Sequence, residues 1–337
     1  MKALVWTDTQ MVELQECALP DYRGKILIKV AYAGICGSDV SVYLGKHPRA
    51  KTPLIMGHEF CGTVEAIGEG AVTPLRPGDR VVVDPLYYCG SCRACLAGNT
   101  HVCRSLRLYG TDSDGGMAEF AAIPADCVLK LPDDLSLETA ALIEPTAVVI
   151  HGLRMIKKPF YGSAAVIGLG PMGLLTALML RNAGVSRLWC VEVNPERVAY
   201  ARSLGLDVID CSQNPVEVIT ALTDGEGVDI LVEASGSRPA AAMMTDLAGV
   251  RAEILLLSVF KDPAAVDLRA INFKEQSLVG CRVYTKLDFK DAIDYVHRNS
   301  DLVSRVISHV KPLEEGQAVF QDIISGHTNT MKVLLQI

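Results

Sequence analysis

The sequence has no excess of positive charge. Among its 337 residues, 32 are lysine or arginine and 39 are aspartate or glutamate, which gives a formal net charge of -7. The basic residues are scattered, so nothing in the charge pattern indicates binding to nucleic acid or to an anionic membrane surface. The first ten residues, MKALVWTDTQ, lack the regions of a secretory signal peptide. We therefore expect a cytoplasmic protein that binds neither nucleic acid nor a membrane.

Internal repeats and low-complexity tracts are also lacking, but one long run has no charge. Residues 161–180, YGSAAVIGLGPMGLLTALML, have the length of a membrane span. Three glycines and a proline interrupt the middle of the run, and its pattern changes there from strand-like to helix-like. A buried strand, a tight turn and a packed helix explain the run better than a membrane span does.

Cysteine, by contrast, is plentiful, and four of the eleven cysteines fall in the stretch YYCGSCRACLAGNTHVC. Cys89, Cys92, Cys95 and Cys103 have the spacing C-x2-C-x2-C-x7-C. In the cytoplasm such cysteines indicate metal ligands and reduced thiols rather than disulfides. Four thiolates complete a tetrahedral zinc site with no open position, which is a structural site. A redox pair and an iron–sulfur cluster remain alternatives. Residues 85–104, the cysteine lobe, have few apolar side chains, so we expect the metal to hold them together.

The pattern of the chain changes near Glu144. Before it, short apolar runs such as KILIKVAYAGI and DRVVVDP alternate with Gly, Pro and Asp turn signals, which is typical of a barrel-like or sandwich-like β domain. After it, strand patterns such as RLWCVEV alternate with helix patterns such as NPERVAYARSLG, which predicts a doubly wound parallel sheet. A chain of 337 residues has room for two such domains.

The stretch VIGLGPMG predicts a dinucleotide-binding turn. Gly168, Gly170 and Gly173 have G-x-G-x-x-G spacing, follow a predicted strand and open a predicted helix, with Pro171 and Met172 between the last two. The first glycine makes the tight turn, the second lets the backbone approach a pyrophosphate, and the third lets helix pack on strand. The helix N-terminus then offers N–H groups and a positive dipole end to the phosphates.

The next strand ends in an acidic residue, as a dinucleotide site requires. Glu192 lies in CVEVN, where a carboxylate accepts hydrogen bonds from the ribose hydroxyls of NAD and repels the extra phosphate of NADP. No arginine follows directly, although Arg197 lies on the next predicted helix. We therefore expect NAD as the cofactor and count Arg197 among the residues near it.

Two further stretches carry metal-ligand types. GICGSDV contains Cys36 and Ser38, and MGHEFCG contains His58 and Glu59. A catalytic zinc takes about three protein ligands and keeps an open position, so these loops together predict such a site. Glu144, in LIEPTAV, lies where a cleft between the two predicted domains would open. By chemistry alone, the alternative is a buried cysteine and a surface turn.

Taken together, these stretches resemble the zinc-dependent medium-chain dehydrogenase/reductase family, in its sorbitol- and polyol-dehydrogenase-like branch. The stretch 57–71 fits the family's zinc signature, and GICGSDV fits its first zinc loop. GDRVVVDP, the cysteine lobe, DGGMAEF, LIEPTAV and VIGLGPMG follow in the family's order, so the resemblance covers nearly the whole chain. It implies an α/β fold with a GroES-like β-rich catalytic domain and a Rossmann coenzyme domain.

The resemblance also implies domain boundaries. Residues 1–146 would form the catalytic domain, with the cysteine lobe at 85–104 as its structural zinc lobe. Residues 147–284 would form the Rossmann domain, and residues 285–337 would return to the catalytic domain.

Residue roles carry over in the same way. The resemblance implies that Cys36 and His58 bind a catalytic zinc, that Glu59 and Glu144 bind it directly or through water, and that Ser38 bonds the substrate oxygen. With the cysteine lobe, this makes two zinc ions per chain. The implied reaction is hydride transfer from a secondary alcohol to NAD, with zinc as a Lewis acid.

Two positions depart from the family's pattern. Ser41 stands where many members have a histidine that ends a proton relay, and Arg282 lies one residue before the place of a sorbitol-binding arginine. A one-residue shift on a strand reverses the face, so that substrate contact is not carried over. We still count Tyr43 and Arg282 as candidates for the substrate pocket. No cluster of basic residues in the sequence indicates a phosphate group on the substrate.

The expected function is therefore NAD-linked oxidation of a polyol, sugar acid or similar hydroxylated molecule to a ketone. Alternatives are a 2,3-butanediol or L-threonine dehydrogenase, a ketone or aldehyde reductase of the same family, and a non-catalytic NAD(P)-binding member. A zinc module that binds nucleic acid is disfavoured by the acidic charge. We expect a homo-oligomer, a tetramer rather than a dimer.

Overall fold

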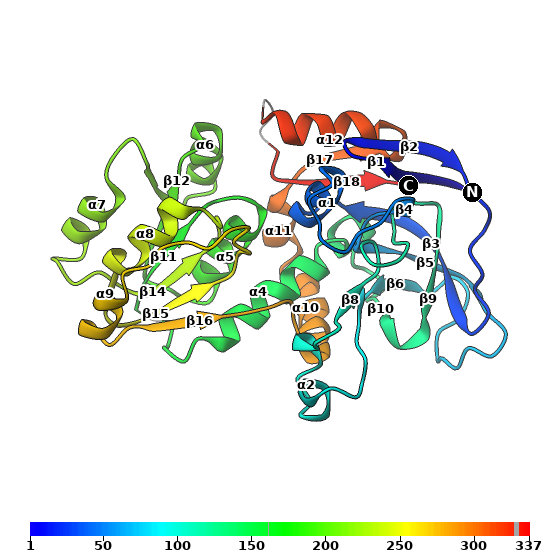
Figure 1. Ribbon diagram of the computed structural model, residues 1–337, viewed down its shortest axis with the longest axis horizontal. Coiled ribbons are helices and arrows are strands. Elements are labelled where there is room, and N and C mark those ends of the chain that lie inside the picture. Colours follow the sequence, from blue (N-terminus) through cyan, green and yellow to red (C-terminus); the bar gives the residue numbers. More distant parts are fainter. Residues whose placement is uncertain (161, 327–329) are drawn as a thin grey trace. The chain divides into compact units, whose positions relative to one another are not determined.

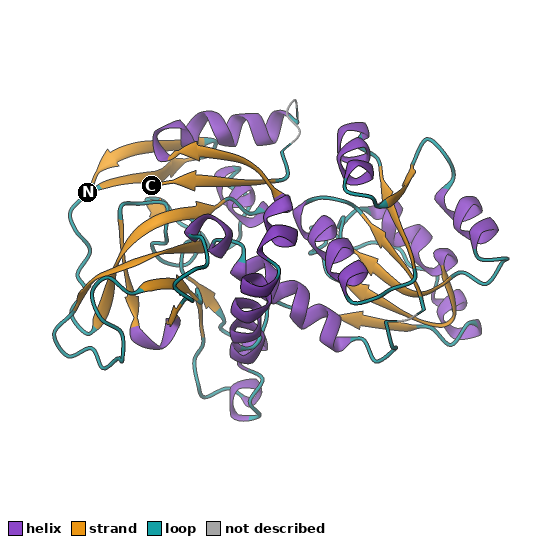
Figure 2. Ribbon diagram, turned by 180° about the vertical axis from the view of Figure 1, so that it is seen from behind, coloured by secondary structure: helices purple, strands orange, loops and turns teal. Residues whose placement is uncertain are grey.

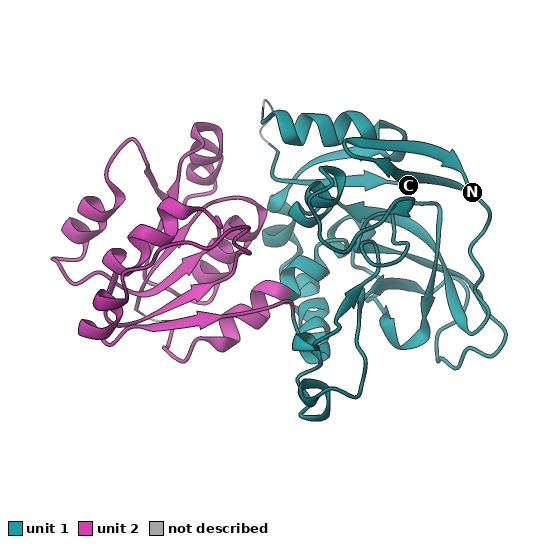
Figure 3. Ribbon diagram, viewed as in Figure 1, with its two compact units in different colours: residues 1–147, 284–337 teal, residues 148–283 magenta. Residues whose placement is uncertain are grey.

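The computed structural model describes residues 1–160, 162–326 and 330–337. The chain divides into two compact units, shown in different colours in Figure 3. Unit 1 comprises residues 1–147 and 284–337, and unit 2 comprises residues 148–283. Each unit is described by itself below.

Unit 1 is rich in strands, most of them short. Its strands are β1 (Lys2–Asp8), β2 (Met11–Glu16), β3 (Lys25–Gly34), β4 (Leu54–Ile55), β5 (Glu59–Ile67), β6 (Arg80–Val83), β7 (Leu86–Tyr87), β8 (Arg107–Leu108), β9 (Phe120–Pro124), β10 (Val128–Lys130), β17 (Ile307–Pro312) and β18 (Lys332–Gln336). Its helices are α1 (Gly37–Tyr43), α2 (Arg93–Leu96), η1 (Thr100–Val102), η2 (Ala125–Cys127), α3 (Leu137–Ala140), α10 (Lys286–Arg298), α11 (Ser300–Val303), η3 (Ser304–Val306), η4 (Leu313–Glu315) and α12 (Gly316–Ser325). Helix α4 (Ile143–Met155) begins in unit 1 and continues past its boundary.

The largest sheet of unit 1 joins the two ends of the chain. Within the described residues, its order is β10-β6-β5-β3-β18-β17, and β9 pairs with β3 as well. The C-terminal strand β18 lies antiparallel to β3, with Leu334 opposite Gly34. In Figure 1 the red β18 accordingly lies among the blue strands of the N-terminal segment. The last strand thereby becomes a neighbour of β3, the strand that leads to Cys36.

The central strands β3 and β5 supply much of the core of unit 1. Residues of β3 and β5 that point to one face, such as Ile26, Ile28, Phe60 and Val64, are buried in one apolar cluster. Side chains on the opposite face, such as Leu27 and Cys61, are buried too, so these two strands are covered on both faces along part of their length. Burial of this surface is the main favourable term that holds the strands together.

Unit 2 confirms the predicted doubly wound α/β fold. Its strands are β11 (Ser163–Ile167), β12 (Arg187–Glu192), β13 (Asp207–Asp210), β14 (Val228–Glu233), β15 (Ala248–Leu256) and β16 (Ser277–Gly280). Its helices are α5 (Pro171–Asn182), α6 (Pro195–Ser203), α7 (Pro215–Leu222), α8 (Arg238–Leu247) and α9 (Leu268–Phe273). In the described residues all neighbouring strands run parallel, in the order β13-β12-β11-β14-β15-β16. Figure 2 shows helices packed around these strands.

The helices of unit 2 begin where the sequence carries start signals. Helices α5, α6, α7 and α8 each have proline in their first turn, where its missing N–H costs nothing. Asn194 and Asn214 cap α6 and α7, because their side chains accept hydrogen bonds from backbone N–H groups of the first turn. The local sequence therefore determines where each crossover helix starts above the sheet.

The uncharged run at 161–180 is not a membrane helix. Residues 163–167 form β11, Gly168 turns the chain with a φ of 87°, and α5 follows from Pro171; Tyr161 lies outside the described residues. Across residues 1–160, 162–326 and 330–337, no helix is long and apolar enough to cross a membrane.

Candidate functional site

Three predicted metal ligands come together in unit 1. One donor atom each from Cys36, His58 and Glu59 lie within 4.8 Å of one another. Cys36 follows β3 and caps α1, while Glu59 is the first residue of β5. The pairing of Gly34 with Glu59 brings the two segments together, and a Cβ at Gly34 would overlap the Glu59 carboxylate. Glycine at the end of β3 is thus a condition for this arrangement.

The Nδ1 side of the His58 imidazole faces the Asp39 carboxylate, in an ion-pair contact without hydrogen-bond geometry. Asp39 is fully buried, its Oδ1 lies 3.4 Å from His58 Nδ1, and its Oδ2 accepts a hydrogen bond of 2.8 Å from the backbone N–H of Cys36. Ser38 Oγ lies 3.5 Å from His58 Nε2, on the other side of the ring. Because Asp39 occupies the Nδ1 side, Nε2 is the nitrogen available to a metal, as in other carboxylate–histidine pairs.

Protonation of His58 reflects this environment. Burial alone lowers the pKa of His58, but the Asp39 carboxylate and the Cys36 thiol raise it above its ordinary value. Binding of a metal would displace that proton. A thiolate, an imidazole nitrogen and a carboxylate oxygen are donor types that zinc takes, so the three residues fit a zinc site.

Glu59 is also paired with a buried lysine. Lys332 of β18 is 2% exposed, and its Nζ donates to both carboxylate oxygens of Glu59, at 2.7 and 2.6 Å, and to the carbonyl of Ile35 at 3.1 Å. Burial lowers the pKa of Lys332, but the negative charges of Glu59 and Cys36 more than compensate and raise it. Each oxygen of Glu59 keeps a second acceptor position, so the pairing leaves the carboxylate able to face a metal.

Glu144 lies near these residues but outside their ligand group. It is buried in the first turn of α4, and its carboxylate is not among the donor atoms within 4.8 Å. Burial raises the pKa of Glu144 to about 7, an effect that the charges of His58 and Lys332 oppose and that of Glu59 increases. Its carboxyl therefore lies within electrostatic range of the metal-ligand candidates.

The four cysteines of the lobe form a second candidate metal site in unit 1. All four sulfur atoms lie within 4.8 Å of one another. Cys103 Sγ is 3.5 Å from Cys89 Sγ and 3.9 Å from Cys92 Sγ, and Cys92 Sγ is 3.5 Å from Cys95 Sγ. These separations are near the edge of about 3.8 Å expected for a tetrahedron with zinc–sulfur bonds of about 2.3 Å, and far longer than a disulfide bond.

Backbone groups favour the ionised form of one of these thiols. Hydrogen bonds from the backbone N–H groups of Ser91 and Cys92 lower the pKa of the Cys89 thiol to about 5. A thiolate is the form that binds zinc. The group therefore fits a closed structural site, and within the described residues none of the four cysteines is in a disulfide bond.

The glycine turn of unit 2 has the geometry that a pyrophosphate needs. A Cβ at Gly168 would overlap Ser235, and a Cβ at Gly173 would overlap the carbonyl of Gly168. Gly170 caps α5 directly before Pro171 and Met172, so the N-terminal N–H groups of this helix are left for a ligand. The Arg197 guanidinium lies 3.7 Å from the position of a Cβ on Gly170, where it faces the same helix end.

Glu192 lies at the carboxyl end of β12 and is bonded to the backbone around it. One carboxylate oxygen accepts from the N–H of Leu169 at 2.7 Å, and the other accepts from Val193 and Asn194 at 2.7 and 2.9 Å. A carboxylate accepts about four hydrogen bonds, so one position remains for a ribose hydroxyl.

Tyr43 was expected at the substrate pocket, and this prediction is wrong. Tyr43 is 1% exposed, its ring stacks on Phe320 with centroids 4.8 Å apart, and its hydroxyl accepts from Gln317 Nε2 at 3.1 Å. The bulky ring at this point of α1 is part of the apolar core, where its burial stabilises the fold. It is therefore not exposed to a substrate. Arg282 lies in unit 2 with an exposed side chain, and the Ser41 hydroxyl donates to the Gly37 carbonyl within α1.

Sequence reasoning missed the roles of Asp39 and Lys332. Asp39 had a weak signal, because it stands three residues after Cys36 at the start of a short helix, where a carboxylate caps the N-terminus. Lys332 is the one charged residue in the stretch TMKVLLQI. A buried lysine of this kind requires an acidic partner, but the sequence does not show which one.

Two family models match the chain. The model for the alcohol dehydrogenase GroES-like domain matches residues 22–133, and the model for zinc-binding dehydrogenases matches residues 171–298. The first range contains the metal-ligand trio and the cysteine lobe, and the second begins at α5.

Relatives of similar length share about a third of their residues with this chain. A 2-dehydro-3-deoxy-L-galactonate 5-dehydrogenase from Pseudoalteromonas atlantica is 34% identical over 95% of this chain and 93% of its own. An L-threonine 3-dehydrogenase from Bacillus subtilis is 33% identical over 99% of this chain and 98% of its own.

Solved structures match the whole chain. Galactitol-1-phosphate dehydrogenase from Escherichia coli has a TM-score of 0.92 at 26% identity and covers 100% of both chains. An alcohol dehydrogenase from Escherichia coli CFT073, complexed with NADH, has a TM-score of 0.91 at 29% identity. A Sinorhizobium meliloti protein bound to NADP has a TM-score of 0.91 at 28% identity. The latter two cover 100% of this chain and 99% of their own.

Proposed function

Because this chain belongs to the zinc-dependent medium-chain dehydrogenase/reductase family, in which it is an oxidoreductase of the alcohol dehydrogenase type, we propose that it is an NAD-linked dehydrogenase. Its substrate in this proposal is a secondary alcohol of a polyol, sugar acid or similar small hydroxylated molecule. The observation that carries the proposal is the convergence of Cys36, His58 and Glu59 within 4.8 Å.

In this proposal Cys36, His58 and Glu59 hold a catalytic zinc, and Glu144 acts beside it. When bound, the metal supplies Lewis-acid polarisation of the substrate oxygen, and NAD accepts the hydride. Asp39 keeps the imidazole ring in one orientation, and Lys332 keeps the Glu59 carboxylate in place. Ser38, 3.5 Å from His58 Nε2, presents a hydroxyl oxygen that takes up the proton of the substrate alcohol while the proton of its own hydroxyl passes to solvent.

A substrate panel tests this function. The zinc-loaded enzyme is assayed for NAD reduction with polyols, aldonic acids, butanediols and threonine, and the same compounds in their ketone form are assayed with NADH. We expect oxidation of a polyol or sugar acid at a kcat/KM of at least about 10⁴ M⁻¹s⁻¹, which is the lower end for enzymes acting on their own substrates. Absence of turnover with every class would contradict the proposal. The same preparation tests the expected tetramer by light scattering.

Glu192 sets the coenzyme preference in this proposal. Glu192→Gln keeps an acceptor oxygen for the backbone N–H groups but removes the charge that repels the phosphate of NADP. We expect the ratio of kcat/KM for NAD to that for NADP to fall about tenfold or more. A change of this size corresponds to the free energy of one charge-assisted hydrogen bond. Glu196→Gln, an exposed carboxylate on α6, is the matched control and leaves the ratio unchanged. An unaltered ratio in Glu192→Gln would remove this residue from the coenzyme site.

The cysteine lobe is proposed to be a structural zinc site. Cys95→Ser is expected to lower the zinc content from two ions per chain to one, because a closed tetrahedral site needs all four thiolates. Limited proteolysis should then cut residues 85–104 faster, while NADH binding to unit 2 is retained. Cys211→Ser is the control. Cys211 is a half-buried thiol outside both candidate metal sites, so this variant is expected to keep both metal ions. Loss of both zinc ions in Cys95→Ser would contradict two separate sites.

A further inference from the structure

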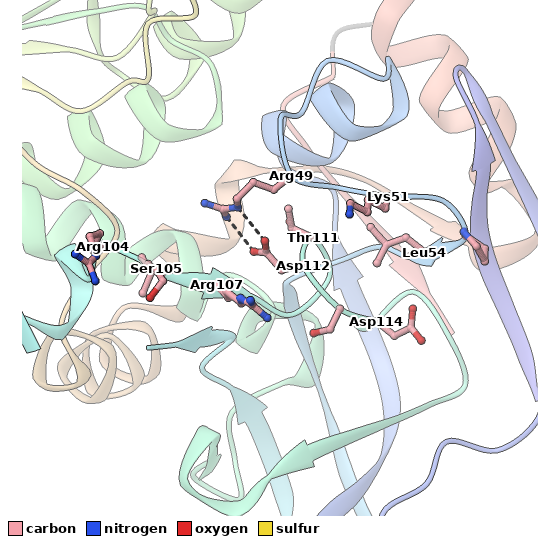
Figure 4. Close-up of a pocket in the computed structure, with 12 residues that line it drawn as sticks. Arg49, Lys51, Leu54, Arg104, Ser105, Arg107, Thr111, Asp112 and Asp114 are labelled. Carbon is pink, nitrogen blue, oxygen red and sulfur yellow. Dashed lines mark hydrogen bonds and ion pairs between the residues drawn. The ribbon is translucent and has the colours of Figure 1, made fainter. Parts of the chain in front are cut away.

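A hollow of about 650 Å³ in unit 1 is lined mainly by polar and charged side chains (Figure 4). Its wall comes from three stretches that are far apart in the sequence: residues 49–54 before and into β4, residues 104–107 after the cysteine lobe, and the turn at 111–114. A volume of this size is in the range of small-molecule sites. The stretches carry no common motif, so the sequence does not indicate the hollow.

The lining has an excess of positive charge. Four cationic side chains, Arg49, Lys51, Arg104 and Arg107, stand against two carboxylates, so two positive charges remain. The chain as a whole has the opposite sign, with a formal net charge of -7. A basic hollow in an acidic protein attracts anions selectively, because a concave wall concentrates the field of its charges.

The two carboxylates of the hollow already have partners. Asp112 accepts from Nε and Nη2 of Arg49, both at 2.9 Å, as the dashed lines in Figure 4 show, and from the N–H of Leu108 at 2.9 Å. Asp114 accepts from the N–H of Ile55 at 3.0 Å. Asp112 therefore neutralises Arg49, whereas Asp114 is held by the backbone and keeps its negative charge, which the three other cations of the lining outnumber.

Three cations are left to meet a ligand. Lys51, Arg104 and Arg107 have exposed side chains, and in the described part of the chain none of them is in an ion pair. Guanidinium groups match the paired oxygens of carboxylates and phosphates through two parallel N–H bonds. The chemistry of the open positions is therefore that of an oxyanion site.

A buried hydroxyl in the wall also has no partner. Thr111 is 1% exposed, and its Oγ1 makes no hydrogen bond to the residues that the structure describes. Figure 4 shows Thr111 beside Asp112 among the lining side chains. Buried polar atoms are nearly always paired, so an unpaired hydroxyl here points to a missing acceptor.

The wall of the hollow is connected by backbone hydrogen bonds to the segment that leads to the candidate metal site. Gly115 donates to the carbonyl of Ile55, and Gly116 donates to that of Gly57, both at 2.8 Å. The turn at 111–114 and β4 are therefore fastened to the segment that ends at His58. The lining residue Leu54 is thus four residues before His58, in a segment whose backbone is hydrogen-bonded to the chain that follows the turn.

We propose that this hollow binds the carboxylate or phosphate group of the substrate, while the alcohol carbon of the same molecule is presented to the metal site. This inference rests on the proposed function and narrows its substrate class to anionic hydroxylated molecules. Lys51, Arg104 and Arg107 bind the anionic oxygens. Arg49 is a positioning residue, held by Asp112.

Kinetics with matched substrates test the proposal. The wild type and the triple variant Lys51→Gln/Arg104→Gln/Arg107→Gln are compared on glucitol, gluconate and glucitol 6-phosphate, which share a six-carbon chain and differ in charge. We expect the triple variant to raise KM for the anionic substrate roughly tenfold or more, with kcat and the KM for glucitol unchanged. A rise in KM for gluconate assigns the hollow to a carboxylate group, and a rise in KM for glucitol 6-phosphate assigns it to a phosphate group. Arg23→Gln, an exposed arginine outside the hollow, is the control.

Equilibrium binding gives a second readout that needs no turnover. Gluconate and inorganic phosphate are titrated into the zinc-loaded enzyme by calorimetry, and at least one should bind the wild type and bind the triple variant roughly tenfold or more weakly. If no alcohol is oxidised but this difference is present, the proposed function fails and the anion site stands. Equal binding by the two proteins, no binding by either, or an equal rise in KM for neutral and anionic alcohols overturns the anion site.

Discussion

Replacement of Cys36 by alanine is expected to lower kcat/KM at least about 1,000-fold and to leave NADH binding unchanged. The substitution removes one of three donors within 4.8 Å of one another. Lewis-acid polarisation is worth several kcal/mol, and each 1.36 kcal/mol is a factor of ten in rate. NADH binding is retained because the glycine turn that is proposed to bind it belongs to unit 2, whereas Cys36 belongs to unit 1.

Three measurements on one preparation check this result: the initial rate of NAD reduction, the zinc content, and an NADH fluorescence titration. Cys17→Ala is the matched control, because Cys17 is a half-buried thiol of the same unit that belongs to neither candidate metal site. We expect it to keep activity and both zinc ions. A Cys36→Ala enzyme that turned over at the wild-type rate would contradict the zinc mechanism.

Replacement of Lys332 by methionine is expected to destabilise unit 1 by about 3–5 kcal/mol, the range for breaking a buried ion pair from one side. The variant leaves the Glu59 carboxylate 1% exposed without its ammonium partner. The pKa of Lys332 is raised in the folded chain, so the lysine is charged at neutral pH and its stabilisation is fully present there. For a unit of this size the melting temperature should fall by roughly 6–20 °C.

Calorimetry of the metal-free and zinc-loaded enzymes measures this loss. With zinc bound, a divalent cation faces the same carboxylate, so we expect a smaller loss than in the metal-free enzyme. Lys29→Met is the control, because Lys29 is an exposed lysine on β3 in the same sheet. The double variant Glu59→Gln/Lys332→Met removes both charges and should recover part of the stability. If Lys332→Met and Lys29→Met have the same melting temperature, the ion pair of Lys332 and Glu59 does not stabilise unit 1.

The architecture of unit 2 could be predicted from the sequence because its signals are local. Glycine spacing, proline in the first helical turn and a carboxylate at the next strand end all act within one β-turn-α unit, where neighbours in sequence are neighbours in space. The cysteine lobe is equally local, since its four ligands lie within fifteen residues. Closing a short loop costs less conformational entropy than closing a long one, so thiols three residues apart come together more readily than distant ones.

Residues that meet across strands were harder to assign. Cys36, His58 and Glu59 could be named from the sequence because their motifs resemble a family, but their convergence depends on the register that places Glu59 opposite Gly34. The partner of Glu59 could not be named, since Lys332 reaches it from the last strand of the chain. Tyr43 illustrates the opposite error, because only packing shows that an aromatic ring near a site belongs to the core.

The sequence by itself determined which side chains have the chemistry of metal ligands and which turn fits a dinucleotide, because donor type and short spacing are properties of the chain. The tertiary structure alone decided which of these side chains are paired and which remain open to a ligand. Asp112 neutralises Arg49, whereas Lys51, Arg104 and Arg107 have no ion-pair partner among the described residues and surround one hollow. The physical reason is that electrostatic interaction depends on distance in space, and residues as far apart in the sequence as Arg49 and Asp112, which are 63 positions apart, meet only after folding.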